Sequence, residues 1–272
     1  NIVMKKNKYI IQPNIEDISL YEKVKGLDQE GERISAKVVQ ERPLTIYLNN
    51  QEIVTLMTIN DYPEYLAIGY LLNQNMINPN ERIRKVEYDK DIQTIVIRTN
   101  RKTNYEKLLK KKITTSGCAQ GTVFGDIYEE IEKTKIKSKT KIKKIWIYEL
   151  SKQITLTPSL YLEAGAIHGC VLCKNNSPLI YMEDVGRHNA IDKIAGFIFK
   201  NKITTNDKIF YTTGRLTSEM IIKTVKMGIP ILISRSGFTA WGVELAMKTN
   251  LTLIGRAKGK RFLVLSGHTR IT

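Results

Sequence analysis

Apolar and polar positions alternate over short stretches in the first third of the chain, and this pattern predicts a small α+β unit. The alternation predicts strands at residues 33–40, 44–48, 52–57, 86–88 and 94–98. Asn49-Asn50 lies between two of these strands and predicts a hairpin turn. From Pro63, apolar residues recur at helical spacing until Asn73. We therefore expect residues 1–112 to form a small α+β domain.

The pattern changes in residues 113–150. Thr, Ser and Gly surround a single cysteine, and lysines then occupy alternate positions, at Lys133, Lys135, Lys137, Lys139, Lys141 and Lys143. Six lysines on one strand face would repel one another, so a solvated linker is the better prediction. We expect a cysteine loop followed by a lysine-rich linker.

Residues 151–272 alternate between apolar strands and amphipathic helices. The predicted strands lie near residues 166–172, 179–182, 208–211, 229–233, 251–255 and 261–265. The predicted helices lie near residues 190–200, 217–227 and 240–249. Strands that alternate with helices favour a sheet covered by helices. The expected fold class is therefore α/β, with the α/β domain at residues 151–272 and the smaller α+β domain before it.

The charge balance is strongly basic. Lys and Arg number 43 against 27 Asp and Glu, a net charge of +16. Such a surface attracts polyanions or acidic partners, although the lysine preference of an AT-rich genome explains it equally well. No run of about 18 apolar residues could cross a bilayer, and the first residues lack the apolar core of a signal peptide. We therefore expect a cytoplasmic protein without a membrane partner.

The three cysteines form an odd set that argues against a disulfide framework. Cys118 lies among Ser116, Gly117 and Gly121, a polar setting that indicates an exposed thiol. The lysines at 110–112 would lower the pKa of this thiol from its ordinary value of roughly 8.5 and raise its thiolate fraction. The alternative is an incidental loop cysteine.

Cys170 and Cys173 have the Cys-x-x-Cys spacing of metal and redox sites. Zinc deaminases combine such a pair with a His-x-Glu motif, but Cys170 stands where the Glu after His168 would be. Val171 and Leu172 between the thiols indicate a buried strand. Packed core cysteines are therefore favoured over a metal site.

Acidic and basic residues gather before and inside the helix predicted near residues 190–200. Glu183 and Asp184 precede Arg187 and His188, and Asp192 follows one helical turn after His188. His188 and Asp192 could therefore touch, and a carboxylate beside an imidazole favours the charged form of the ring. The alternative is a helix-start network in which the two acids favour the positive end of the helix.

Two loops and one turn supply further anion-binding candidates. Gly214-Arg215 and Ser234-Arg235 each follow an apolar strand and precede a helix. Free backbone N–H groups and arginines would then face the carboxyl edge of the sheet, where α/β folds bind anions. A basic turn adds four cations, in the segment Arg256, Ala257, Lys258, Gly259, Lys260 and Arg261.

The run Glu-Asp-Val-Gly-Arg-His-Asn-Ala that begins at Glu183, together with the segment around Cys118, resembles the FdhD family of accessory sulfurtransferases that mature formate dehydrogenases. Four further stretches carry the same resemblance in order, at residues 164–168, 213–220, 231–236 and 250–255. The resemblance extends from about residue 33 to the last residue. It implies a cytidine-deaminase-like α/β fold for residues 151–272.

The resemblance also implies a function. Cys118 would accept sulfane sulfur from a cysteine desulfurase as a persulfide. It would then pass the sulfur to the bis-guanine-dinucleotide cofactor of molybdenum or tungsten before this cofactor enters the formate dehydrogenase catalytic subunit. Many relatives carry Cys-x-x-Cys in the loop, but Gly121 stands at the second position, so a mechanism that needs both cysteines is in doubt.

The leading hypothesis is thus a sulfurtransferase that acts as a persulfide carrier. The alternatives are a non-catalytic cofactor chaperone or polyanion-binding module and, more remotely, a zinc-dependent nucleotide deaminase. We expect a homodimer, no nucleic-acid partner and no metal ligand. GDP would serve as a surrogate for one arm of the cofactor. The expected cofactor-binding residues are His168, Glu183, Asp184, Arg187, His188, Asp192, Gly214, Arg215, Ser234, Arg235 and residues 256–261.

Overall fold

A mixed six-stranded sheet forms the centre of the protein. The computed structural model describes residues 9–100, 112–114 and 122–272. The strands run in the order β10-β9-β11-β12-β13-β14. Their bounds are β9 (His168–Lys174), β10 (Ser177–Asp184), β11 (Ile209–Thr212), β12 (Ile231–Ser234), β13 (Thr252–Lys258) and β14 (Arg261–Ser266). The central strands β11, β12 and β13 are parallel, and their neighbours are antiparallel. The mixed α/β class predicted from the sequence is confirmed.

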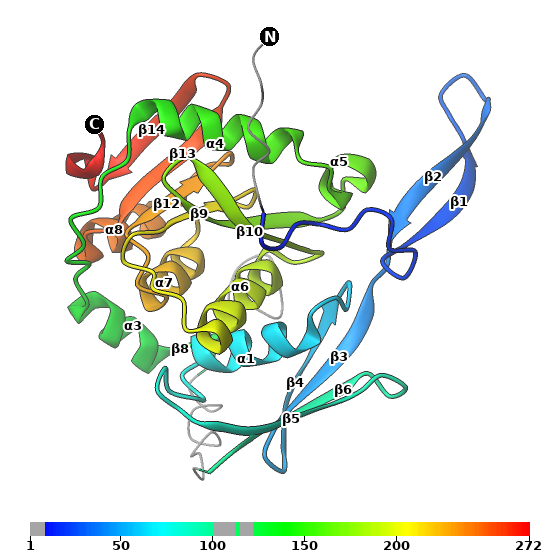
Figure 1. The fold of residues 1–272 in the computed structure, drawn as a ribbon, viewed down its shortest axis with the longest axis horizontal. Helices are drawn as coiled ribbons and strands as arrows, with labels where there is room; N and C mark the ends of the chain where they lie inside the picture. The colour runs from blue at the N-terminus through cyan, green and yellow to red at the C-terminus, as the bar shows by residue number, and fades with distance from the viewer. Residues whose placement is uncertain (1–8, 101–111, 115–121) are drawn as a thin grey trace.

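Helices cover both faces of this sheet (Figure 1). Helices α6 (Arg187–Asn201), α7 (Ser218–Lys226) and α8 (Ala240–Thr249) share one hydrophobic cluster with strand residues such as Leu172 and Phe210. Helix α4 (Lys144–Leu156) packs on the other face, with Val171 and Tyr211. Neighbouring residues such as Val171 and Leu172 lie on opposite faces because side chains alternate along a strand. Within the described ranges, no helix has both the length and the apolar character needed to span a bilayer.

A second, four-stranded sheet lies in the first half of the chain. Its order is β4-β3-β6-β5, with β3 (Arg42–Leu48), β4 (Gln51–Thr58), β5 (Ile83–Asp89) and β6 (Thr94–Thr99). The predicted hairpin is confirmed: β3 and β4 pair antiparallel, and Asn49 takes the left-handed conformation in the turn, with φ 55°. Helix α1 (Pro63–Asn73) begins at the predicted proline. A further hairpin of β1 (Tyr21–Leu27) and β2 (Arg33–Val39) projects from the body (Figure 1).

Helix α1 crosses helix α6 at very short range. A Cβ on Gly69 would lie 1.7 Å from the backbone oxygen of Asp192, and a Cβ on Gly196 would lie 1.9 Å from that of Tyr65. Only glycine allows the two backbones to approach so closely. One hydrophobic cluster therefore continues from the four-stranded sheet through α1 into α6.

The described parts of the segment between the two sheets form elements that the sequence did not predict. It contains β7 (Lys112–Thr114), β8 (Thr122–Phe124), α3 (Gly125–Lys133) and, after α4, the short α5 (Leu160–Ala164). The alternating lysines are exposed, as expected, but Ile136 and Ile142 between them are buried. The backbone N–H of Ile136 donates to the oxygen of Thr249 at 2.8 Å. The predicted solvated linker is therefore an extended chain held against the body, with its lysines outward.

Candidate functional site

Most of the predicted site residues meet at one edge of the six-stranded sheet. Because β9 is antiparallel to β11, His168 at the start of β9 lies where β11 ends. The backbone N–H of Thr213 donates to the oxygen of Gly169 at 3.0 Å. Asp184, the last residue of β10, pairs with His168 at the same edge.

The loops after β11 and β12 brace each other at this edge. Ser234 donates its hydroxyl to the backbone oxygen of Gly214 at 2.6 Å and accepts the N–H of Ser236 at 2.9 Å. These bonds fix the loops that carry Arg215 and Arg235. Arg215 is exposed, whereas Arg235 is half-buried.

The predicted basic turn joins the same edge. The backbone N–H of Arg256 donates to the oxygen of Ser236 at 2.8 Å. Arg235 lies 5.4 Å above the ring of Tyr161 and lines a cavity of about 410 Å³ with residues 257–260 and the α4 residues Tyr148 and Lys152. Of the four exposed cations of the turn, Lys258 and Lys260 line this cavity together with Arg235. Arg256 and Arg261 lie close to them in the sequence.

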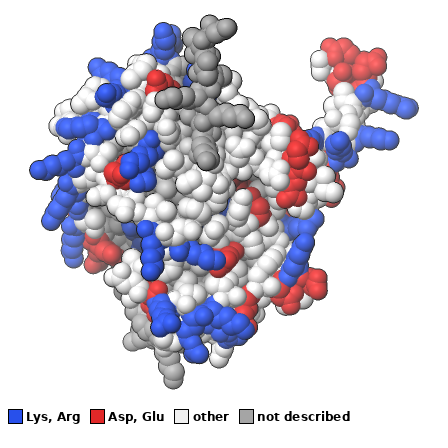
Figure 2. Space-filling model, viewed as in Figure 1, with Lys and Arg blue, Asp and Glu red and all other residues white. Residues whose placement is uncertain are grey.

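Gly259 takes a left-handed conformation in this turn, with φ 60°. Proline is restricted to φ near −65°, so a proline at this position could not adopt the same turn. Cations outnumber acids over much of the visible face, while the tip of the β1–β2 hairpin is acidic (Figure 2).

Buried basic groups lie behind the exposed ones. Arg187 and His188, in the first turn of α6, are both buried. A Cβ on Gly214 would lie 2.9 Å from Cδ of Arg187, so the loop fits closely around this arginine. Burial, followed by the charge of Arg187, lowers the pKa of His168. His168 is therefore a neutral imidazole at pH 7.

The predicted contact between His188 and Asp192 is replaced by two other pairs. Nε2 of His188 lies 3.0 Å from a carboxylate oxygen of Glu219 in α7. Asp192 binds Lys223, whose Nζ lies 2.9 Å from both carboxylate oxygens, and it also accepts from Asn73 at 2.6 Å. Asp192 points to the α1 and α7 side, so it belongs to an internal network.

Glu183 and Asp184 are also bonded inside the fold. The carboxylate of Glu183 accepts the backbone N–H groups of Leu160 and Tyr161, each at 2.9 Å. Burial raises the pKa of Glu183 to about 7. This carboxylate caps the start of α5, because the first N–H groups of a helix have no partner within it.

Asp184 lies at the centre of a second buried network. It accepts from the hydroxyl of Thr58 at 2.6 Å and lies 2.5 Å from Nζ of Lys193, which also binds Asp61. Sequence reasoning missed Lys193 and Lys223. Both lie among apolar residues in predicted helices, and a lysine on such a face needs a carboxylate partner. A lysine on the apolar face of a predicted helix was therefore the sequence signal for a buried ion pair.

Cys170 and Cys173 pack in the core, as predicted. Cys170 belongs to the cluster of α6, α7 and α8, and Cys173 belongs to the cluster of α4 on the opposite face. Burial raises the pKa of both thiols, that of Cys170 to about 12. Two thiols on opposite faces of a sheet cannot bind one metal ion. Within the described part of the chain, no group of three or more His, Cys, Asp and Glu residues is placed to hold a metal.

Cys118 lies outside the described residues, but the segments on either side of it are placed. Thr114 of β7 pairs with Thr122 of β8. Helix α3 follows directly and packs against α7 and α8. The ring of Tyr128 in α3 stacks on Trp241 in the first turn of α8, with centroids 4.7 Å apart. Helix α8 begins just after the loop of Arg235, so α3 lies beside the helix that follows this loop.

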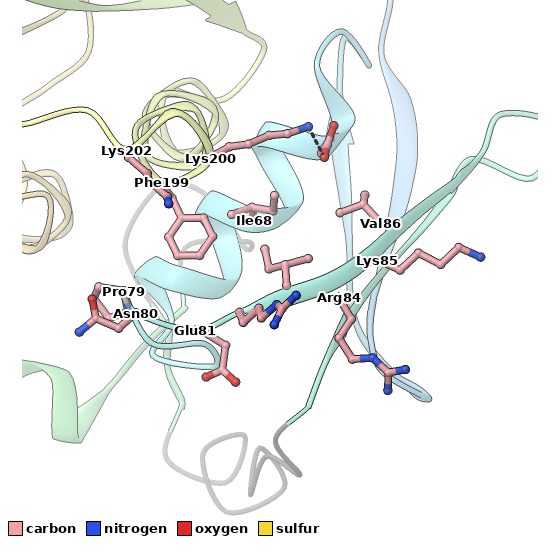
Figure 3. Close-up of a pocket in the computed structure, with 13 residues that line it drawn as sticks. Ile68, Pro79, Asn80, Glu81, Arg84, Lys85, Val86, Phe199, Lys200 and Lys202 are labelled. Carbon is pink, nitrogen blue, oxygen red and sulfur yellow. Dashed lines mark hydrogen bonds and ion pairs between the residues drawn. The ribbon is translucent and has the colours of Figure 1, made fainter.

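A separate cavity of about 770 Å³ lies between α1, the end of α6 and β5 (Figure 3). Ile68 and Phe199 point into it, while Arg84 and Lys85 point away from it. Lys200 at its rim lies 2.5 Å from Glu64. None of the site residues predicted from the sequence lines this cavity.

The chain is similar to a known protein family over most of its length. The sequence model of the FdhD/NarQ family matches residues 39–272. The chain belongs to the FdhD/NarQ family. Among members of this family, it is similar to the sulfur carrier protein FdhD of Bacillus pumilus, with 31% identity over 87% of this chain and 90% of that protein. The protein of the same name from Listeria innocua is 30% identical over 89% of this chain and 94% of its own length.

A solved structure has the same fold as this FdhD/NarQ family member. It is a protein of Desulfotalea psychrophila that is provisionally described as a formate dehydrogenase accessory protein. The TM-score is 0.75 and the identity 26%, and the match covers 93% of this chain and 98% of the other. The likeness therefore includes both sheets.

Proposed function

We propose that this protein carries sulfur during the maturation of a formate dehydrogenase, with Cys118 as the residue that holds the sulfur. Relatives across nearly the whole chain are named sulfur carrier protein FdhD. Family membership over residues 39–272 supports the same role. The other two cysteines, Cys170 and Cys173, both belong to buried clusters.

The proposed first step is a thiol–persulfide exchange. The thiolate of Cys118 attacks the outer sulfur of a persulfide on a cysteine desulfurase. The sulfur–sulfur bond of the donor breaks, the donor cysteine leaves as a thiolate, and a new persulfide forms on Cys118. The lysines at positions 110–112 favour the attacking thiolate electrostatically.

The placement of the elements on either side of Cys118 in the sequence is the observation that carries this proposal. Thr114 of β7 pairs with Thr122 of β8. Stacking of Tyr128 on Trp241 ties the following helix, α3, to the start of α8. A sulfur carrier needs its thiol near the site of its acceptor, and α8 follows the loop that carries Arg235.

The proposed acceptor is the bis-guanine-dinucleotide cofactor of molybdenum or tungsten, bound as a substrate. Its phosphates would contact Arg215, Arg235 and the basic turn at 256–261. These groups suit phosphates because arginine offers paired donors and because most of them are exposed beside a cavity. On delivery the acceptor would supply the electron pair of a new bond to the outer sulfur, the persulfide bond would break, and Cys118 would leave as the thiolate.

Intact mass after incubation with a cysteine desulfurase and cysteine tests the carrier step. The protein should gain one sulfur atom, and Cys118→Ser should gain none. Cys170→Ser is the matched control and should gain sulfur like the parent protein, because Cys170 is completely buried. If Cys118→Ser still supports formate dehydrogenase activity in cells, the carrier mechanism fails and the non-catalytic chaperone takes its place.

A further inference from the structure

A second cavity lies where the end of α1 meets α3, α6 and the end of α7. Its volume is about 690 Å³. Apolar side chains form most of its wall, at Leu72, Pro79, Ile131, Ala195, Ile198, Phe199, Ile203, Val225 and Met227. It shares Pro79, Phe199 and Lys202 with the cavity of Figure 3 but includes no residue of the sheet edge described above. Concave pockets with a mainly apolar wall and some polar groups are the usual form of small-molecule sites.

The side chain of Lys226 also lines this cavity. Lys226, the last residue of α7, is partly buried, and its Nζ donates to Oδ1 of Asn75. The side-chain N–H of Asn75 donates in turn to Glu130 at 2.9 Å. Asn75 therefore stands between the ammonium and the carboxylate, and the ion pairs of the described residues include none for Lys226.

Two other buried lysines, in contrast to Lys226, each form an ion pair with a carboxylate. Lys223, one turn earlier on α7, binds the carboxylate of Asp192, and Lys193 binds those of Asp61 and Asp184. A buried cation is costly unless it is paired. Among the described residues, Lys226 donates to an amide oxygen, and the one carboxylate on the cavity wall, that of Glu130, is hydrogen-bonded to Asn75 instead. An anion bound in the cavity would supply the negative charge that the ammonium group of Lys226 lacks.

We propose that this cavity binds an amphiphilic carboxylate, with the carboxylate on Lys226 and the apolar body against α6 and α3. The apolar wall would bury the hydrocarbon, and Lys202 at the rim adds a second positive charge. The ligand would link α3, which directly follows the cysteine segment, to α6 and α7. This site is independent of the proposed sulfur transfer.

The binding depends on pH in a defined direction. Burial lowers the pKa of Lys226 to about 8, although the charge of Glu130 opposes this shift. The other charged group on the cavity wall is Lys202, the residue after α6, and the wall residues from the end of α1 and the turn after it carry no charge. Carboxylate affinity should therefore fall as the pH rises through about 8, because the ammonium loses its proton.

Calorimetric titration with octanoate, octanol and octylamine tests the site. Octanoate should bind one molecule per chain, octanol should bind more weakly, and octylamine should bind least. Absence of octanoate binding, or octylamine binding as tight as that of octanoate, overturns the proposal.

Variants separate the charge from the cavity. Lys226→Met should weaken octanoate binding on the order of tenfold, and it should leave octanol binding unchanged, which also shows that the cavity is intact. Lys226→Arg should retain most of the affinity for octanoate. Lys152→Met, which removes a lysine from the cavity beside α4, is the matched control and should have no effect. Equal octanoate affinity for Lys226→Met and the parent protein overturns the proposal.

Discussion

Nε2 of His188 lies 3.0 Å from Oε2 of Glu219, and both side chains are almost completely enclosed. Burial is the larger influence and lowers the pKa of His188, while Glu219 acts in the opposite direction. Glu219→Gln should therefore lower the pKa of His188 further, as an NMR titration of the imidazole would show. An unchanged or higher pKa would mean that the glutamate does not stabilise the imidazolium.

The glycines at the α1–α6 crossing should not tolerate a methyl group. Gly69→Ala or Gly196→Ala places a carbon within 2 Å of a backbone oxygen, so either change should destabilise the protein by about 3 kcal/mol or more. Gly26→Ala is the matched control, because a Cβ there has no neighbour within 4 Å. Urea denaturation measures the difference, and similar losses at all three positions would contradict the close crossing.

Removing one member of the Asp192–Lys223 pair should be worse than removing both. Lys223→Met leaves a buried carboxylate without its cation and should cost about 3–5 kcal/mol, whereas Asp192→Leu combined with Lys223→Met should recover part of this loss. Lys248→Met, in a half-exposed pair with Glu132, should cost less than about 1 kcal/mol. Chemical denaturation of the four proteins gives the comparison. A double variant less stable than Lys223→Met would show that the pair is not isolated from its surroundings.

Glu183 should make stability depend on pH. Its pKa is raised to about 7 in the folded protein, so the folded state holds the proton more tightly than the unfolded state does. The resulting stability is fully present below the ordinary pKa of about 4.3 and is lost as the pH rises through 7, by at most about 3 kcal/mol. The stability difference between the parent protein and Glu183→Gln should thus be larger at pH 5 than at pH 7.5. A constant difference in denaturation experiments would argue against the raised pKa.

GDP should bind more tightly than guanosine if the basic sheet edge receives phosphates. Arg235→Ala should weaken GDP binding on the order of tenfold, since it removes a charged hydrogen-bond donor. Arg33→Ala, an exposed change on the β2 hairpin, should have little effect. Added salt should weaken binding by screening. Equal calorimetric affinities for GDP and guanosine would remove the support for a phosphate site.

Periodicity predicted the elements that bury one side. The helical spacing of Ile191, Ile194, Ala195 and Ile198 predicts a buried stripe on the helix near 190–200. The first three are buried and Ile198 is half-buried. Strand β1 was missed because nearly all of its residues are exposed, so no apolar alternation marks it. Helix α4 was missed although Ile147, Leu150 and Ile154 recur at helical spacing, since the lysines around them suggested a linker.

The site was predicted in outline but not in its pairings. The loops of Arg215 and Arg235 follow from the rule that strands deliver their carboxyl ends to one edge. Lys223, which binds Asp192, in contrast lies 31 residues away on another helix. Asp61, one of the two aspartates that bind Lys193, lies 132 residues away in sequence. Spacing within one helix shows which residues share a face. It does not show which helix covers that face, so Lys223 could not be assigned to Asp192.

Lys193 joins parts of the chain that are distant in sequence. Its ammonium group is neutralised by Asp184 of the second half and by Asp61 of the first. A fragment that ended between the two sheets would leave this ammonium short of negative charge in the interior. Expression of the two halves as separate pieces should therefore destabilise the half that contains Lys193, because Asp61 would be missing from it.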